Sequence, residues 1–234
     1  MINGKRVLAI VPARGGSKGI KNKNLLKING KSLLEHVATV VGSIDEIDKC
    51  IVSTDSHHIV KDAVKHGLSA PFMRPKEISG DFIGDWEVIH HALLEVERID
   101  GVNYDYIVML QPTSPLRKPH EVREALRLLV DKNYTSVWTL SESDPKYHPL
   151  KQMKLDGTDM THYSPSGKKI VARQQLDKLY HRNGVAYVFT RNCIVQSKNI
   201  WGNRPGGLRL VAPHISIDTL GDVRAIEALI NGSN

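Results

Sequence analysis

The sequence predicts an α/β fold, with a mainly parallel sheet and helices on both of its faces. Short runs rich in Val and Ile alternate with longer stretches of helical periodicity along most of the chain. This alternation is typical of parallel strands that are connected by helices. The length of 234 residues and the shares of hydrophobic (41%) and charged (24%) residues suit one globular domain with a sizeable core. We therefore expect a single domain over residues 1–234.

Six apolar runs are expected to form strands, at 7–11, 50–54, 106–110, 135–140, 184–189 and 208–211. Helices are expected at 56–65, 86–98, 119–131 and 219–230, with one more that begins after Ser32. Ser32 and Glu35 have the spacing of a capping box. Pro119 suits the first turn of its helix, because that turn does not use the missing N–H.

Residues 142–182 interrupt the alternation. The segment is polar and rich in Pro and Gly, so we expect an arm rather than another strand and helix. A loop of this length in a compact domain is usually functional or disordered.

The charge of the chain is concentrated in one place. The formal net charge is +7, and six Lys and Arg residues fall between Arg14 and Lys31 with no acid before Glu35. One basic loop suits a compact anion such as a triphosphate better than a long duplex, so no nucleic-acid partner is expected.

The composition also excludes other classes of protein. No apolar run approaches the ~20 residues of a membrane span, and the N-terminal apolar run is too short for a secretion signal. Cys50 and Cys193 lack metal-ligand spacing and suit reduced core residues. Neighbouring histidines face different ways on a helix, which argues against zinc. We expect a cytoplasmic protein without a membrane partner.

The segment 11–24 is the first candidate site. It follows an apolar strand and contains three glycines and four basic residues. Glycines let backbone N–H groups approach phosphate oxygens closely, and the cations supply charge. The spacing is neither that of a P-loop nor that of the dinucleotide fingerprint. The alternative is a solvated basic surface loop.

The same segment resembles the signature loop of the CMP-sugar synthetases, the cytidylyltransferases for N-acylneuraminate and related 3-deoxy-2-ulosonic acids. Their pattern is an apolar strand, then A-R-x-x-S-K-G and a lysine-asparagine pair, found here as Ala13-Arg14, Ser17-Lys18-Gly19 and Lys23-Asn24. Further segments resemble the family in order, at 52–56, 74–81, 91–93, 110–117, 148–151, 173–176, 182–184 and 217–222. The resemblance covers roughly residues 5–230 and implies a Rossmann-like nucleotidyltransferase fold.

The resemblance also implies a set of site residues. The nucleotide-binding candidates are Ala13, Arg14, Ser17, Lys18, Lys23, Asn24 and Arg74. Asp85 is a further nucleotide-binding candidate, although it lies in a segment (83–85) that departs from the small and hydroxyl residues of the family. The sugar-binding candidates are Gln111, Lys151, Arg173, Arg182 and Asn183, and the metal candidates are Asp218 and Asp222. Arg14, Lys23 and Asp218 are the candidates for the chemistry itself. For Asp85 two interpretations stay open, a ligand of the cytosine amino group or a ribose hydroxyl, and the N-cap of the helix that begins at Trp86.

One departure from the family concerns its metal segment. The family has two aspartates separated by one residue, whereas here Ser216 precedes Asp218 in that spacing. Magnesium prefers carboxylates, phosphates and water to a neutral hydroxyl. Either Asp218 with the CTP phosphates and water suffices, or another acid such as Asp222 helps.

The implied reaction transfers CMP from CTP to the anomeric 2-hydroxyl of a nine-carbon acidic sugar, with Mg²⁺ as cofactor and release of pyrophosphate. It would serve cell-surface glycan synthesis, in a homodimer whose arm (142–182) reaches the partner's sugar site. Neuraminic, legionaminic, pseudaminic and deaminated sugars stay open. One alternative is a synthetase for an eight-carbon acid, although those relatives carry an acid after the glutamine where this chain has Pro112. Another is a non-catalytic nucleotide- or RNA-binding protein, which Ser216 would allow.

Overall fold

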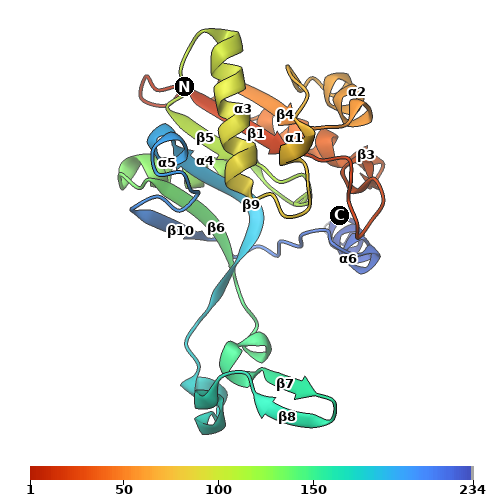
Figure 1. Cartoon of the computed structure of the whole chain (residues 1–234), viewed down its shortest axis with the longest axis vertical. Coiled ribbons are helices and arrows are strands. Elements are labelled where there is room, and N and C mark those ends of the chain that lie inside the picture. Colours follow the sequence, from red (N-terminus) through yellow and green to blue (C-terminus); the bar gives the residue numbers. More distant parts are fainter. Residues whose placement is uncertain (233–234) are drawn as a thin grey trace. The chain divides into compact units, whose positions relative to one another are not determined.

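The computed structural model describes residues 1–232 and contains one six-stranded sheet (Figure 1). The strands are β1 (Val7–Pro12), β4 (Lys49–Ser53), β5 (Tyr106–Met109), β6 (Ser136–Glu142), β9 (Tyr180–Thr190) and β10 (Pro205–Arg209). Their order in the sheet is β10-β6-β9-β5-β1-β4. β1 pairs in parallel with both β4 and β5, and β9 runs antiparallel to β5. The predicted mainly parallel sheet is confirmed, and β9 is its reversed member.

The helices are α1 (Leu33–Val41), α2 (His57–Lys65), α3 (Asp85–Asp100), α4 (Pro119–Asp131), α5 (Arg191–Val195) and α6 (Leu220–Asn231). All five predicted helices are present. The Ser32 hydroxyl accepts a hydrogen bond from the Glu35 N–H and caps α1. The N-cap interpretation of Asp85 is wrong by one residue, because Gly84 is the N-cap and Asp85 already lies in the first turn. Among residues 1–232, no helix has the length and apolar character needed to cross a membrane.

Helices cover both faces of the sheet because side chains alternate along each strand. Val7, Ala9 and Val11 of β1 belong to a core that they share with α1, α2 and α4. Leu8 and Ile10 point to the opposite face and are also fully buried. The helix α3 packs against β1 and lies in front of the sheet in Figure 1.

A second, smaller core fixes the C-terminal part of the chain. It contains Ile28 of the short strand β2 (Lys27–Ile28), Leu33 at the start of α1, Ile217 and Ile226 of α6. β2 pairs with β3 (Lys31–Ser32). The packing of Ile217 holds the next residue, Asp218, in a defined place.

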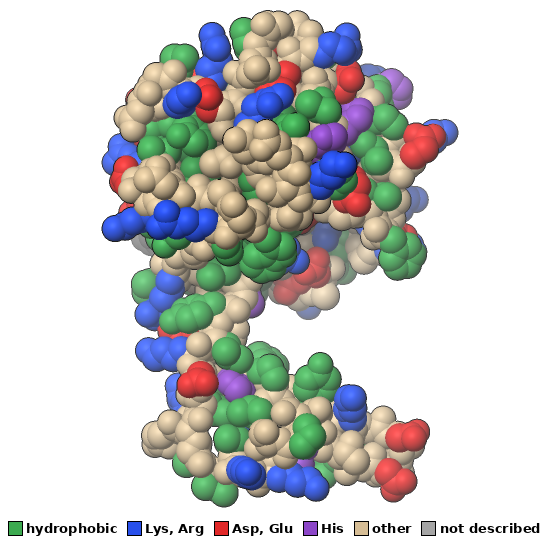
Figure 2. Space-filling model, turned by 60° about the vertical axis from the view of Figure 1, so that its left-hand side comes forward, with side chains coloured by type: hydrophobic (Ala, Val, Ile, Leu, Met, Phe, Trp, Pro, Cys, Tyr) green, Lys and Arg blue, Asp and Glu red, His purple; other side chains and the backbone are tan. Residues whose placement is uncertain are grey.

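Residues Leu140–Arg182 and Arg209–Pro213 form a compact unit of their own. This second unit contains the hairpin of β7 (Met153–Asp156) and β8 (Asp159–His162) and four short 3₁₀ turns. Within 140–182 only His148 and Gly167 are buried, and Leu210 is the one large apolar side chain that the unit buries, so the unit has almost no apolar core of its own. Figure 2 shows apolar side chains among the charged ones on its surface. The exposed large ones are Tyr147, Met153, Leu155, Met160, Tyr163, Val171, Leu179, Tyr180 and Val211.

Candidate active site

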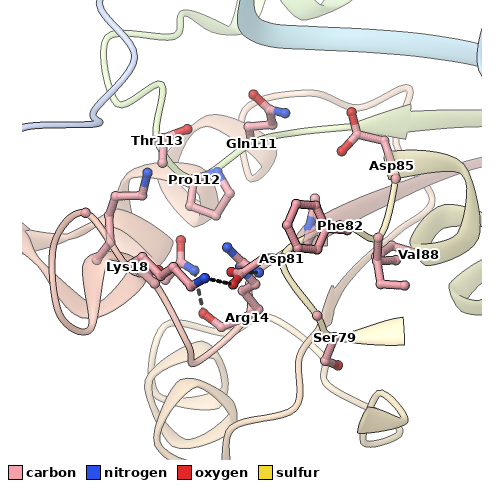
Figure 3. Close-up of a pocket in the computed structure, with 18 of the residues that line it drawn as sticks. Arg14, Lys18, Ser79, Asp81, Phe82, Asp85, Val88, Gln111, Pro112 and Thr113 are labelled. Atoms are coloured by element: carbon pink, nitrogen blue, oxygen red, sulfur yellow. Dashed lines mark hydrogen bonds and ion pairs between the residues drawn. The ribbon is translucent and has the colours of Figure 1, made fainter. Parts of the chain in front are cut away.

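A cleft of about 770 Å³ lies at the carboxyl ends of β1 and β5 (Figure 3). Open α/β sheets bind their ligands at this edge, and the volume is in the usual range for a ligand site. The polar and charged residues that line it are Arg14, Ser17, Lys18, Lys23, Asn24, Arg74, Ser79, Asp81, Asp85, Gln111, Thr113, Ser216 and Asp218. The cleft therefore unites segments that are far apart in the sequence.

The basic loop after β1 is held in shape from within. The amide of the buried Asn24 donates to the carbonyl of Arg14 at 2.9 Å. The N–H of Gly15 donates to Asp55 Oδ1 at 2.8 Å, from the turn that follows β4. Arg14 and Lys18 thus project from a fixed backbone into the cleft, which does not suit the alternative of a merely solvated loop.

Asp81 pairs with both of these cations. Its Oδ1 lies 2.7 Å from Arg14 Nη1, and its Oδ2 lies 2.5 Å from Lys18 Nζ (Figure 3). The hydrogen bond from Lys18, with a smaller contribution from Arg14, holds the pKa of Asp81 below its usual range. The carboxylate is charged and occupies the position between two cations that an anionic ligand would also seek.

Arg74 forms a second positive wall, deeper in the cleft. It is 5% exposed, and its Nε and Nη2 atoms are buried without a hydrogen-bond partner. Burial lowers the pKa of Arg74, while the charge of Asp55 raises it. Unpaired donors of a buried guanidinium are costly, so this side chain is suited to a ligand that supplies acceptors.

Lys23 joins the basic loop to the C-terminal segment. Its Nζ donates to the carbonyl of Ile217 at 2.9 Å and to Asp218 Oδ1 at 3.0 Å. The Asp218 side chain is 75% exposed, whereas Lys23 is only 19% exposed. Lys23 is therefore anchored by the backbone and carries a charge that Asp218 partly neutralises.

The turn after β5 presents Gln111 to the cleft. The buried Arg117 braces this turn by donating to the carbonyls of Gln111 (2.6 Å), Gly184 (3.1 Å) and Val185. Burial lowers the pKa of Arg117 to about 10, which leaves it charged at neutral pH. Gly184 has φ +73°, and a Cβ there would lie 2.6 Å from Gln111 Oε1. Only glycine fits beside Gln111 at this position.

The metal candidates differ in what their oxygens already do. Asp222 Oδ2 accepts from the N–H groups of Asp218 and Thr219 and from the Thr219 hydroxyl, so it caps α6. The Ser216 hydroxyl donates to Thr113 Oγ1 at 3.3 Å. No group of three or more His, Cys, Asp and Glu suited to a metal occurs within residues 1–232. The donor set fits a magnesium ion held by Asp218 together with substrate phosphates and water.

Residues that sequence reasoning missed form the apolar side of the cleft. Ile78, Phe82, Ile83 and Val88 line it, and Phe82 is fully exposed. An aromatic residue between Gly80 and Gly84 was the available signal. Apolar side chains in the same cleft as the cations suit the ring of a nucleotide base.

Other predicted residues lie outside this cleft. Ala13 is buried beneath the loop. The Asn183 side chain accepts from the Thr139 hydroxyl at 2.7 Å and from the Val185 N–H at 3.2 Å. Lys151, Arg173 and Arg182 belong to the second unit, where Arg173 lines a separate cavity of about 590 Å³.

The profile of a known family, described as cytidylyltransferase, matches residues 8–223. The chain belongs to the cytidylyltransferase family. This cytidylyltransferase is 29% identical over 229 residues to the CMP-N,N'-diacetyllegionaminic acid synthase of Legionella pneumophila, with 96% of each chain covered. It is 27% identical to the pseudaminic acid cytidylyltransferase of Campylobacter jejuni, with 95% of each covered. Like these relatives, the cytidylyltransferase is a nucleotidyltransferase enzyme.

A more distant likeness extends to larger relatives and to solved structures. The N-acylneuraminate cytidylyltransferase of Escherichia coli is 28% identical over 199 residues. The aligned part covers 84% of this chain and 45% of that longer protein. A structure of CMP:2-keto-3-deoxy-manno-octonic acid synthetase complexed with CTP superimposes with a TM-score of 0.70 at 17% identity, covering 98% of this chain and all of that one. This likeness confirms the Rossmann-like nucleotidyltransferase fold of the cytidylyltransferase.

Proposed function

We propose that the protein transfers CMP from CTP to the anomeric 2-hydroxyl of an acidic nine-carbon sugar and releases pyrophosphate. The observation that carries the proposal is the cleft at the sheet edge, where Arg14, Lys18, Lys23 and Arg74 converge. A triphosphate needs such charge neutralisation, most of all when charge builds up on the departing pyrophosphate.

The chemistry divides between the walls of the cleft. Arg14 and Lys23 would bind and orient the triphosphate, with Ser17 and Lys18 in support, so that the α-phosphorus faces the attacking hydroxyl. Phe82 and the neighbouring apolar side chains would exclude water from one side of the base. Asp85, in the first turn of α3, has a carboxylate suited to the cytosine amino group or a ribose hydroxyl. Gln111 also lines the cleft, where it would orient the base or the sugar.

A magnesium ion would be held by Asp218 and the phosphates, and when bound it would supply charge neutralisation and lower the pKa of the sugar hydroxyl. Because Asp218 supplies only one carboxylate, the other ligands of the ion would be CTP phosphate oxygens and water. Asp222 is committed to the helix cap, so we assign it a supporting role.

The names of the relatives favour the nine-carbon sugar class, because they act on legionaminic acid, pseudaminic acid and N-acylneuraminate. Pro112 follows Gln111 where synthetases for eight-carbon acids carry an acidic residue, which speaks against that class. Use of CTP also agrees with the cytoplasmic location expected from the sequence.

A substrate panel tests the proposal. Purified protein with CTP and Mg²⁺ should release pyrophosphate only when an acidic ketose is present, and N-acylneuraminate, legionaminate and pseudaminate should exceed the eight-carbon acid. A nucleotide panel with UTP and ATP is the matched control. If CTP binds and no acidic sugar elicits pyrophosphate, the chain is the non-catalytic nucleotide-binding protein instead.

We also propose that the protein is a homodimer whose second unit contributes to the sugar site of the partner. The unit exposes nine large apolar side chains and buries only one, Leu210. A two-stranded hairpin is marginal in water unless something packs against it, and this many exposed large apolar side chains on one small unit suit an interface. Lys151, Arg173 and Arg182 on this unit are the cations that a sugar carboxylate needs.

Subunit exchange tests this arrangement. Lys23→Ala and Arg173→Ala should each be nearly inactive alone. Mixed and allowed to exchange, they should recover roughly a quarter of wild-type activity, since half of the dimers are mixed and one of their two sites is intact. Light scattering and a tagged pull-down verify dimers and exchange. Exchange without recovery would place Arg173 in its own subunit's site, and a fully active monomer would refute the dimer.

A further inference from the structure

Asp81 lies in the cleft where the product of the proposed reaction would leave, paired with Arg14 and Lys18. Both oxygens of Asp81 are engaged, one with each cation, at 2.7 and 2.5 Å. All three residues line the cleft. One of the two positive charges proposed to bind the triphosphate is therefore neutralised by the protein itself when no ligand is bound, and a polyphosphate that binds both cations must displace this carboxylate.

The segment that carries Asp81 can leave without disturbing the core. Gly80 and Gly84 flank it, and both are exposed. Phe82, the next residue, is fully exposed. A Cβ at Gly80 would meet only Ile83, at 3.8 Å, so the backbone there is loosely packed. Displacing Asp81 breaks two ion pairs and no buried apolar contact of Phe82.

Lys23 and Asp218 form a pair of a different kind. Lys23 also donates to the carbonyl of Ile217 at 2.9 Å, and Ile217 is buried in the smaller core. The loss of Asp218 would leave Lys23 in place. Arg14 and Lys18, in contrast, share Asp81 as their acidic partner in the part of the chain that the structure describes. Whether these two cations are paired or available to a ligand therefore depends on Asp81.

We infer that Asp81 is an internal competitor that returns to Arg14 and Lys18 after the reaction and expels pyrophosphate from the cleft. The inference rests on the proposed function, in which pyrophosphate is the product left on these cations. A carboxylate on a short tether has an effective concentration on the order of millimolar. It therefore competes well with a free product, whose departure limits turnover in many enzymes.

The competing explanation is that Asp81 positions Arg14 and Lys18 for the substrate. The two roles predict opposite effects on binding. Loss of a competitor tightens the complex with pyrophosphate, whereas loss of a positioning group weakens it. Asp81→Asn removes the charge with little change of shape, and Asp81→Ala removes the hydrogen bonds as well. Glu77→Gln is the matched control, because Glu77 is exposed in the same segment and lies outside the cleft lining.

Calorimetric titration with inorganic pyrophosphate and Mg²⁺ tests the inference at fixed ionic strength. Asp81→Asn and Asp81→Ala should bind pyrophosphate at least ~10-fold more tightly than the wild type, and Glu77→Gln should stay within about twofold. In turnover, Asp81→Asn should lower both kcat and the KM for CTP, and a burst of product should precede the steady state. If the wild type binds pyrophosphate and both Asp81 variants bind it equally or more weakly, the inference about Asp81 is wrong, while the proposed function still stands. If neither the wild type nor the variants bind pyrophosphate, the phosphate assignment of the proposed function fails together with it.

Discussion

Arg14→Ala and Lys23→Ala should each reduce turnover at saturating CTP by at least ~100-fold. Each removes a charge that is preorganised for the departing pyrophosphate, and the loss of one such group from an electrostatic site costs about this much. Lys23 should have the stronger effect, because it is only 19% exposed and is fixed by the carbonyl of Ile217. Steady-state kinetics of pyrophosphate release gives the measurement.

Lys21→Ala is the matched control for this pair. Lys21 lies in the same basic loop, is exposed and does not line the cleft. It should retain turnover within about twofold, since an exposed charge at a distance is screened by salt. Both cleft variants should still fold, as circular dichroism and thermal unfolding would verify. Near-wild-type turnover in either cleft variant would refute the assignment of the loop to phosphate.

Asp218→Asn should abolish activity, and the activity of the wild type should require a divalent ion. Asp218 lines the cleft and pairs with Lys23, whereas Asp81 is already engaged by Arg14 and Lys18. An amide is a poor substitute where magnesium rests on one carboxylate. Titration of Mg²⁺ into the protein with a non-hydrolysable CTP analogue measures the ion independently of turnover. Retention of full activity in excess chelator would contradict the prediction.

Ser216→Asp is the complementary variant. It restores the spacing of two aspartates that the related enzymes carry, and Ser216 lies beside Thr113 in the cleft. A second carboxylate should tighten Mg²⁺ in the same titration. Unchanged affinity would mean that Asp222 already acts on the ion in spite of its role in the helix cap.

The sequence predicted most of the sheet and its covering helices because their apolar periodicity is strong. The run before Arg14 and the stripe of α3 from Val88 to Val96 are buried as expected. The five-residue helix α5 is too short to show a period. The hairpin β7–β8 escaped prediction because each strand has only four residues and both are almost fully exposed. The alternation in Met153–Asp156 is too short to mark a strand.

The location of the site was predictable in part. The sequence motifs next to the strands contain Arg14, Lys23, Arg74, Gln111 and Asp218. These residues were expected at one edge of the sheet, because the carboxyl ends of parallel strands meet there. The pairing of Asp81 with Arg14 and Lys18 could not be predicted, since it depends on how a loop some sixty residues downstream folds back. The burial of Arg74 without a partner is likewise a property of packing rather than of any local pattern.

The contact between Lys23 and Ile217 joins positions 194 residues apart, and the smaller core likewise unites Ile28 with Ile226. Contacts of such large sequence separation form late, because the entropy of closing the intervening chain must be overcome first. During translation Lys23 leaves the ribosome early, and neither of its two partners is available until residues 217 and 218 emerge. A nascent chain therefore presents an unpaired Lys23 to the RNA-rich surroundings of the ribosome, and the lining of the cleft is complete only in a late step of synthesis.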